Sequence, residues 1–447
     1  MVWVGLLSLA CGRDERPFVL LITVDTLRAD RLGAYGSPLG LTPHLDALAE
    51  RSEVFDAAYA PASYTFPSVA ALLSGRYPEE IGALANRSML QARISTLAEV
   101  LSLYDWRTGA VVSNYVLRRG TGIEAGFEAY DDRVPELETK RTALKRSAAD
   151  ATDAALALLD RLAEAQGAGR FLWIHYQDPH GPYVPPDGRR ERYLEREREA
   201  PDGRRRLPAH PECSKLDCIP AYQYFQGEHE AAFYRAGYDG EVSQLDEQIG
   251  RLFAGVEERG FLDNAVIVFT ADHGESLGED DYWFQHGEYV SDPLVRVPLM
   301  LRVPGRPPAR RGDLCSLVDV FPTLLRLAGP SPPEGYRGRD LLAPGAESVA
   351  SPVYSSNLGS APILRYGLTH DGHRLLVAHH EAGVEERLYA VGDESRELGA
   401  ADPERLGRMR AELASFRKSL RGGLDERSKP LSPEERERLR GLGYLLD

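Results

Sequence analysis

The stretch PASYTFPSVAALLSGRYP at residues 61–78 has the pattern of a polar loop that enters a short apolar helix. Pro67 suits the first helical position, where its missing N–H group loses no hydrogen bond. Gly75 is typical of a helix end, and Pro78 disfavours a restart. Thr65 is therefore expected just before a helix N-terminus, where N–H groups attract an incoming anion. Its hydroxyl can serve there as an N-cap or as a nucleophile.

Two apolar runs end in residues that suit a metal site. Residues 18–24 lead into Asp25, and a later run leads into TADHGE at residues 270–275. Open α/β sheets place their sites at such carboxyl ends of buried strands. Asp272 and His273 are adjacent and can both reach one divalent ion. A strand-terminal aspartate such as Asp25 also has a purely structural alternative, the cap of a following helix.

The chain around Thr65 resembles the sulfatase branch of the alkaline phosphatase superfamily. That family carries C/S-x-P-S-R-x-x-x-L-x-G-R, and this chain has TFPSVAALLSGR at residues 65–76. Two positions depart from the pattern, because Thr65 replaces the Cys or Ser that becomes formylglycine and Val69 replaces the arginine. Members of the superfamily that act on phosphate esters and phosphodiesters use an unmodified Thr or Ser. The segments that contain Asp25 and Asp272 resemble the same family.

The resemblance implies a single divalent cation held by Asp25, Thr65, Asp272 and His273. Oxygen ligands with one imidazole suit Ca²⁺, Mg²⁺ or Mn²⁺, and Zn²⁺ is a further alternative. The family often has a second aspartate after the first, but this chain has Thr26 there. The sequence has no D-x-x-x-H pattern to supply a second metal site, so one ion is expected.

The resemblance also supplies candidate catalytic and substrate-binding residues. The segment DPHGPY at residues 178–183 is similar to the family's D-x-H-x-P-Y, whose histidine meets the transferred group or the leaving oxygen. His180 is therefore a catalytic candidate. His286 is another, because sulfatases place a Lys or His nearby to hold substrate oxygens. Asn114 and Arg76 are the expected substrate contacts. A loop histidine outside such a context is usually a solvated surface residue.

Buried apolar runs that alternate with amphipathic helices predict an α/β fold. We expect a large, mostly parallel sheet with helices on both faces, as in alkaline phosphatase. From residue 353 onward, short strands and turns predict a small antiparallel sheet packed by one helix. The expected organisation is an export segment at 1–17, a catalytic domain at 18–330 with an insertion at 187–227, a C-terminal subdomain at 345–420 and a tail helix at 421–447. The charged insertion is either a solvated face or a lid over the site.

The net charge and the N-terminal residues limit which partners and which location are expected for the protein. The 447 residues carry a formal net charge of −15, which argues against nucleic acid as a partner. The N-terminal LSLACG resembles the end of a bacterial lipoprotein signal without its basic segment, so we expect an exported, periplasmic or membrane-anchored lipoprotein with a lipid on Cys11. The alternative is a plain soluble terminus. Export would allow a disulfide between Cys213 and Cys218, and Cys315 is expected to be a buried thiol.

Three functions are compatible with these patterns. The first is a metal-dependent hydrolase of sulfate or phosphate esters of a small molecule, a glycan or a lipid, with Thr65 as the nucleophile. Formylglycine expels sulfate with its second hydroxyl and Thr65 has only one, so phosphorus esters are expected to turn over faster. The second is a transferase that moves a phospho-headgroup through the same threonine ester. The third is a polyanion-binding relative without turnover, which Val69 motivates.

Overall fold

The computed structural model describes residues 16–134, 146–164, 168–186, 188–209, 216–348, 351–359, 363–420 and Ser432. Cys11 in the expected export segment, Cys213 in the expected insertion and most of the expected tail helix lie outside these residues. The domain boundaries given above therefore stay predictions.

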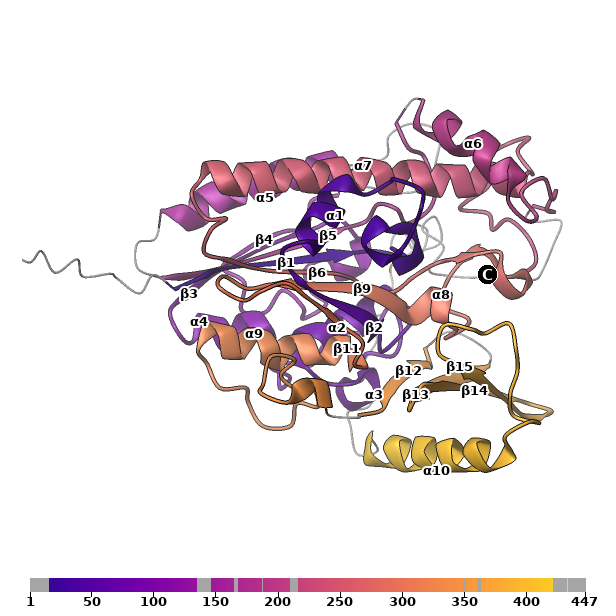
Figure 1. Ribbon diagram of the computed structural model, residues 1–447. Helices are drawn as coiled ribbons and strands as arrows, with labels where there is room; N and C mark the ends of the chain where they lie inside the picture. Colours follow the sequence, from indigo (N-terminus) through magenta and orange to yellow (C-terminus); the bar gives the residue numbers. More distant parts are fainter. Residues whose placement is uncertain are drawn as a thin grey trace, which may run out of the picture.

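A sheet of nine strands forms the centre of the described part of the chain (Figure 1). Strands β4, β3, β5, β1 and β6 run parallel to one another, whereas β9 runs antiparallel to both β2 and β6. The expected mostly parallel sheet is confirmed, with one reversed strand that the sequence pattern did not single out. The order is β10 (Ala309–Arg311), β2 (Glu53–Tyr59), β9 (Arg296–Arg302), β6 (Ala265–Ala271), β1 (Phe18–Val24), β5 (Gly169–Tyr176), β3 (Trp106–Val112) and β4 (Ala129–Asp131), and β11 (Cys315–Ser316) also pairs with β2.

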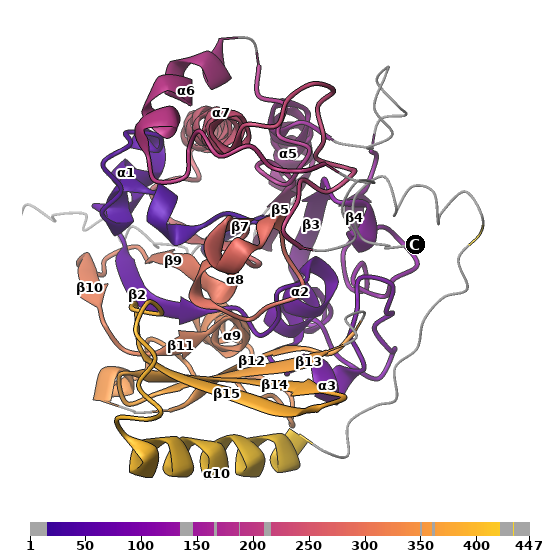
Figure 2. The same cartoon turned by 90° about the vertical axis from the view of Figure 1, so that its right-hand side faces the viewer.

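Helices cover both faces of this sheet, as expected. Every residue of β1 and β6 is buried, and such continuous apolar strands are typical of sheets that are covered on both sides. Figure 1 and Figure 2 show the two helical layers, one above and one below the sheet. The upper layer consists of α1 (Pro43–Ala49), α5 (Ala148–Ala163) and α7 (Ala231–Glu258), and the lower layer of α2 (Thr65–Ser74), α4 (Leu97–Ser102) and α9 (Val320–Ala328).

Shorter elements complete the large layered body. Two of them, β7 and α8, lie at the end of the molecule that faces the viewer in Figure 2. The α-helices are α3 (Pro78–Ile81), α6 (Arg189–Glu199) and α8 (Asp292–Val295), and β7 (Ser276–Leu277) pairs with β8 (Trp283–Gln285). The 3-10 helices are η1 (Ala29–Arg31), η2 (Gly33–Tyr35), η3 (Tyr115–Leu117), η4 (Glu279–Asp281), η5 (Leu317–Asp319) and η6 (Ala346–Ser348).

Helix α2 begins slightly earlier than its sequence predicts. The helix starts at Thr65 itself, and Tyr64 occupies the N-cap position, so Pro67 is the third helical residue rather than the first. Gly75 ends the helix in the left-handed conformation with φ of 65°, as expected. Pro78 does not prevent a restart, because it opens α3, where a proline at the first position loses no hydrogen bond.

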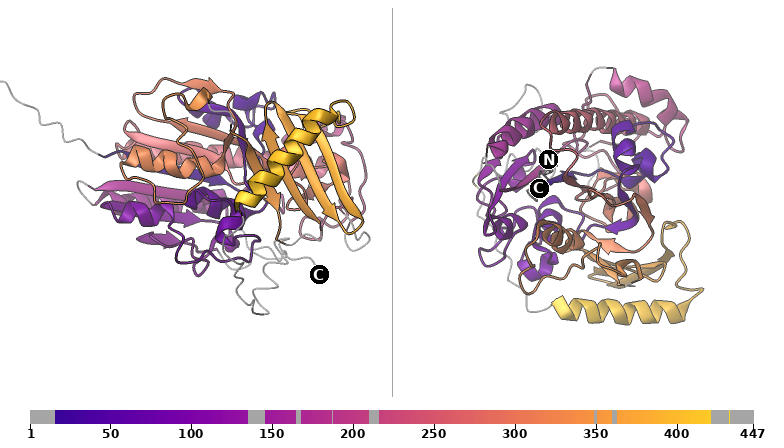
Figure 3. Two further views of the ribbon diagram at one scale, coloured as in Figure 1. Left: turned by 90° about the horizontal axis from the view of Figure 1, so that it is seen from below. Right: turned by 60° about the vertical axis from the view of Figure 1, so that its left-hand side comes forward.

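The C-terminal part forms the expected small antiparallel sheet. Its four strands lie side by side, and α10 packs against them on the side away from the large sheet (Figure 3). Backbone contacts join it to the loop before α2, because the Ser356 N–H group donates to the Pro61 carbonyl at 2.9 Å. The elements are β12 (Val353–Asn357), β13 (Leu364–His370), β14 (His373–His380), β15 (Gly383–Ala390) and α10 (Pro403–Leu420).

The cysteines and helix lengths bear on the expected location. Cys218 is disulfide-bonded, while Cys213 lies outside the described residues. Cys315 is a buried free thiol, as expected. Among the residues that the structure describes, none of the helices combines the length and the apolar character needed to cross a bilayer.

Candidate active site

Strand pairing brings the two predicted aspartates together. β1 and β6 are parallel neighbours with Val24 aligned to Ala271, so Asp25 and Asp272 follow directly at the same sheet edge. The Asp272 N–H group donates to the Val24 carbonyl at 3.0 Å, which continues the ladder up to the site. Both aspartates are fully buried. The strand-end rule thus places the two carboxylates as the sequence predicts.

His273 and Thr65 complete this group. The His273 Nδ1–H group donates to the Gly274 carbonyl at 2.8 Å, so Nε2 carries the lone pair. His273 Nε2 lies 3.3 Å from Thr65 Oγ1, 3.6 Å from an Asp25 oxygen and 3.7 Å from an Asp272 oxygen. The Thr65 hydroxyl therefore contacts the metal-ligand candidates, and the N-cap position belongs to Tyr64 instead.

The first turn of α2 is fixed against the end of β6. The Ser68 hydroxyl donates to the Asp272 carbonyl at 2.6 Å, and the Phe66 N–H group donates to the Asn86 side-chain oxygen at 2.9 Å. All ten residues of α2 are buried. Because the helix cannot rotate without breaking these contacts, Thr65 is held in place beside His273.

His175 joins the group, although no sequence pattern singled it out. Its Nδ1 lies 2.9 Å from the Thr23 hydroxyl, which also accepts a hydrogen bond from the Trp173 indole N–H. Its Nε2 is buried, has no hydrogen-bond partner among the described residues and lies 4.0 Å from an Asp25 oxygen. One donor atom from each of His175, Asp25 and Asp272 lies within 4.8 Å of the other two.

The electrostatics of this group fit a bound divalent cation. Burial raises the pKa of Asp25 well above the ordinary carboxyl range, with Asp272 as the next cause, and burial raises the pKa of Asp272 to about 8. Burial also lowers the pKa of His175 to about 3, so this imidazole is neutral. The oxygens of Asp25 and Asp272 and the lone pair of His273 Nε2 lie close together, and such electron-rich atoms repel one another. A metal ion would remove that repulsion, and the donors present are those that divalent metals take.

Two further predicted residues, His180 and His286, lie on one side of this group. Their ring centroids are 5.0 Å apart, and the His286 ring is 4.6 Å from the ring of His273. The His180 Nδ1–H group donates to the Gly181 carbonyl at 2.8 Å. Burial lowers the pKa of His286 well below the ordinary histidine value, so its imidazole is neutral. The three imidazoles thus form a row that ends at His273, and His273 contacts Thr65.

Comparison with known proteins agrees with this geometry. A family model described as Sulfatase matches residues 17–330. The chain belongs to the sulfatase family. It is 25% identical to the iduronate 2-sulfatase of Homo sapiens over 412 residues, which cover 74% of each protein. As a member of this family, the chain is a hydrolase of ester bonds.

Solved structures share the fold of this sulfatase-family chain. The phosphonate monoester hydrolase SpPMH from Silicibacter pomeroyi gives a TM-score of 0.71 at 21% identity, covering 93% of this chain and 99% of that one. The structure of BT4656 in complex with its substrate, D-glucosamine-2-N,6-O-disulfate, gives 0.72 at 20% identity, covering 91% and 98%. The fold therefore occurs in proteins named for phosphonate esters and for sulfated sugars.

The structure places only one of the two predicted substrate-binding residues next to the metal-ligand candidates. The Asn114 amide, at the end of β3, donates to an Asp25 oxygen, so this residue belongs to the cluster. Arg76 does not reach it, because Arg76 follows the far end of α2 and its guanidinium donates to the Glu334 carbonyl at 2.7 Å. Val69, at the position of the family's arginine, is fully buried among apolar residues.

Thr26, at the position of the family's second aspartate, has an unusual backbone. Its φ is 57°, which is uncommon for a β-branched residue and is typical of functional sites. Its N–H group donates to an Asp272 oxygen at 3.3 Å, and its carbonyl accepts from the Tyr238 hydroxyl at 2.7 Å. The strained backbone therefore supports a metal-ligand candidate directly, which no sequence signal indicated.

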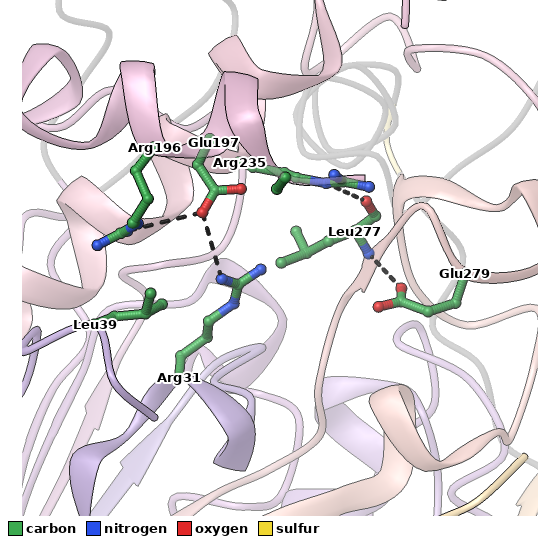
Figure 4. Close-up of a pocket in the computed structure, with 8 residues that line it drawn as sticks. Arg31, Leu39, Arg196, Glu197, Arg235, Leu277 and Glu279 are labelled. Carbon is green, nitrogen blue, oxygen red and sulfur yellow. Dashed lines mark hydrogen bonds and ion pairs between the residues drawn. The ribbon is translucent and has the colours of Figure 1, made fainter. Parts of the chain in front are cut away.

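The expected insertion has two parts with different surroundings. In the charged part, α6 lies along α7, and Figure 4 shows Arg31 and Arg196 directed toward Glu197. A cavity of about 300 Å³ lies beside these ion pairs. The later part approaches the site, because the ring of Tyr222 lies 6.2 Å from that of His180. The charged part is thus an ion-paired face, and the later part lies beside His180.

Proposed function

We propose that this sulfatase-family chain hydrolyses phosphorus esters, with Thr65 as the nucleophile and one divalent cation at the ends of β1 and β6. One observation carries the proposal. The Thr65 hydroxyl lies at the N-terminus of α2 and 3.3 Å from His273 Nε2, beside the carboxylates of Asp25 and Asp272. A hydroxyl at the positive end of a helix dipole and beside a metal site is well placed to attack an anionic ester.

Four side chains would hold the cation. They are Asp25, Asp272, His273 and His175, which supply carboxylate oxygens and neutral imidazole nitrogens. When bound, the cation supplies Lewis-acid chemistry, which favours ionisation of a nearby hydroxyl and stabilises charge on a phosphoryl oxygen. Two imidazoles favour Mn²⁺ or Zn²⁺ more than an all-oxygen set does, and Ca²⁺ and Mg²⁺ stay on the list of candidates.

The residues of the chain divide the proposed reaction into two steps. Thr65 Oγ1 forms a bond to phosphorus while the bond to the leaving oxygen breaks, and the positive end of the α2 dipole favours the negative charge on the phosphoryl oxygens. Thr65 loses one proton and the leaving oxygen gains one, for which His286 and His180 are the candidate carriers. Water then cleaves the threonine ester, and Thr65 regains its proton.

The preference for phosphorus follows from the chemistry of a single hydroxyl. A formylglycine hydrate has a second hydroxyl that expels sulfate by reforming the aldehyde, and Thr65 has none. Its sulfate ester would need direct attack by water, which releases a phosphate ester more readily. The single threonine hydroxyl thus supports turnover of phosphorus esters in particular.

The experiment that tests this function compares matched substrates under each metal. Purified protein would be assayed with 4-nitrophenyl sulfate, 4-nitrophenyl phosphate, bis(4-nitrophenyl) phosphate and 4-nitrophenyl phenylphosphonate, each with Ca²⁺, Mg²⁺, Mn²⁺ or Zn²⁺. We expect kcat/KM to be higher for at least one phosphorus ester than for the sulfate. A faster sulfate reaction would contradict the phosphorus preference, and tight binding without turnover of any ester would favour a non-catalytic relative.

A further inference from the structure

Glu275 is a fully buried carboxylate next to the metal-ligand candidates. It closes the TADHGE segment, and among the described residues its side chain forms no ion pair with an arginine or lysine. A buried carboxylate is costly unless it is hydrogen-bonded. Its two oxygens have separate partners, because Oε1 lies 3.0 Å from His286 Nδ1 and Oε2 accepts from the Tyr183 hydroxyl at 3.0 Å.

These two contacts join three segments of the site. Tyr183 follows His180 in the loop after β5, Glu275 follows β6, and His286 follows β8. The Tyr183 hydroxyl donates to one carboxylate oxygen, and the other oxygen makes its own contact with the imidazole. Burial raises the pKa of Glu275 to about 8. In its ionised form the carboxylate accepts but does not donate, so His286 Nδ1 then carries the proton in this contact and Nε2 is turned away from Glu275.

We propose that Glu275 is a positioning residue for His286. Its hydrogen bond holds the imidazole in the tautomer with the proton on Nδ1 and fixes the ring beside His273, which leaves Nε2 with the lone pair that can exchange a proton. The inference rests on the proposed function, in which His286 carries a proton to the leaving oxygen. A carboxylate orients an imidazole in the same way in nucleophile–imidazole–carboxylate triads. Here Glu275 contacts His286, whose ring lies beside that of His273, and His273 contacts Thr65.

The proton step balances without a further reactant. In the first half-reaction one proton leaves Thr65 and one arrives at the leaving oxygen, and His286 Nε2 is the nitrogen that exchanges it. In the second half-reaction one proton leaves the attacking water and one returns to Thr65. The Nδ1–H group stays on Glu275 throughout, so the ring keeps one orientation in both steps.

Three variants separate positioning from simple packing. Glu275→Leu keeps a similar volume but removes the acceptor, whereas Glu275→Gln keeps a carbonyl that can accept from Nδ1–H. Tyr183→Phe is the matched control, because it removes the other hydrogen bond of Glu275 and leaves the contact with His286. Phosphate esters with good and poor leaving groups, 4-nitrophenyl and phenyl, report on proton transfer to the leaving oxygen.

We expect the loss of kcat in Glu275 variants to depend on the leaving group of the ester. Glu275→Leu should lower kcat on the phenyl ester by roughly 10- to 100-fold, the usual effect of losing a residue that orients another, and should lower it much less on the 4-nitrophenyl ester. Glu275→Gln should recover most of this loss, and Tyr183→Phe should keep the wild-type ratio of the two esters. Introducing Glu275→Leu into a His286→Ala background should add no further loss.

A second measurement does not depend on the enzyme's substrate. Nitrogen NMR of the histidine rings should show His286 as the Nδ1–H tautomer in the wild type and in Glu275→Gln, and as a mixture in Glu275→Leu. If the tautomer is unchanged in Glu275→Leu, or if its loss of kcat is equal for both esters, Glu275 only packs. If the tautomer responds but no phosphorus ester is hydrolysed, the positioning stands and the proposed function fails.

Discussion

Thr65 differs from serine by one methyl group and from alanine by its hydroxyl as well. We expect Thr65→Ala to lower kcat for a phosphorus ester by a factor of roughly 10³ or more, as loss of other catalytic nucleophiles does. Thr65→Ser should keep partial activity, because the hydroxyl that contacts His273 is retained. Steady-state kinetics on both variants, with metal content checked, would measure this. Near-full turnover by Thr65→Ala would exclude Thr65 as the nucleophile.

The metal-ligand candidates that the sequence predicted share one property, because each lies at the end of a strand or helix that the sequence pattern also predicted. Asp25 and Asp272 end apolar runs, and parallel strands bring their carboxyl ends to one edge, so local pattern was sufficient. His175 was missed because it lies inside such a run, where a buried histidine looks like part of the core. Its nearness to Asp25 depends on the pairing of β1 with β5, which the sequence does not display.

Arg76 is a motif match that lies away from the metal-ligand candidates, and its role as a substrate contact stays a prediction. It follows Thr65 by eleven positions, and eleven residues of helix span about 16 Å. The guanidinium accordingly bonds to the loop carbonyl of Glu334. A sequence motif with helical spacing therefore fixes which residues lie on one helix, but it does not place both of its ends at the same site.

At the scale of elements, the metal site depends on the ends of β1, β5 and β6. We expect Asp272→Ala to remove most of the bound ion, because one carboxylate is a large share of such a site. His175→Ala should weaken Mn²⁺ and Zn²⁺ binding more than Ca²⁺ binding, since imidazole prefers the first two. Mass spectrometry for metal content and calorimetric titration would measure this.

A metal ion bound at these strand ends should also raise the free energy of unfolding. At a free concentration of 100 times Kd, a bound ion adds about 2.7 kcal/mol to the free energy of unfolding. This increment should be present in the wild type and absent in Asp272→Ala. An unchanged metal-to-protein ratio in Asp272→Ala would show that these strand ends do not form the site.

The packing of α2 on α9 depends on a glycine. Gly75 has φ of 65°, and a Cβ built there would lie 2.7 Å from the ring of Phe321 in α9. We expect Gly75→Ala to lower the free energy of unfolding by at least about 1–2 kcal/mol, because the left-handed conformation alone costs that much. Denaturant unfolding monitored by circular dichroism would measure this.

Gly407 in α10 is the matched control for Gly75. It lies within a helix, and nothing lies within 4 Å of an added Cβ. Gly407→Ala should therefore raise the free energy of unfolding by about 0.5–1 kcal/mol. Equal destabilisation by both substitutions would contradict the role assigned to the end of α2.

The local sequence pattern predicted some elements well, but it did not predict the direction of β9 or the first residue of α2. The C-terminal strands were predictable because turns separate short alternating runs, and the helix expected to pack on them is α10. The reversed direction of β9 was not, since an apolar run gives no sign of its orientation in a sheet. The start of α2 at Thr65 depends on contacts from Asn86 and Asp272, which come from other elements.

At the scale of the whole molecule, a buried arginine links the small sheet to the large one. Arg374 in β14 is fully buried, donates to the Val290 carbonyl and lies 3.3 Å and 3.5 Å from carboxylates of Asp292 and Glu394. Arg374→Leu leaves both carboxylates without this partner, and removing one member of a buried ion pair costs about 3–5 kcal/mol. We expect a loss of this size in denaturant unfolding.

An exposed ion pair of the small sheet gives the control for Arg374. Arg410 on α10 pairs with Glu386 at the surface, with more than half of the arginine side chain exposed. Arg410→Leu should change stability by less than about 1 kcal/mol, as surface pairs do. Limited proteolysis should also cut the C-terminal sheet faster in Arg374→Leu than in Arg410→Leu. Equal rates would mean that Arg374 does not hold the two sheets together.

The covalent role of Thr65 is tested most directly by mass spectrometry of acid-quenched protein. Metal-loaded enzyme would be mixed with 4-nitrophenyl phosphate, quenched during the first turnovers and digested, with Thr65→Ala treated alongside. We predict a phosphoryl group on Thr65 in the peptide from α2, formed as 4-nitrophenol is released and absent from Thr65→Ala. A burst of 4-nitrophenol with Thr65 unmodified, or with the phosphoryl group on another residue, would contradict a threonine nucleophile.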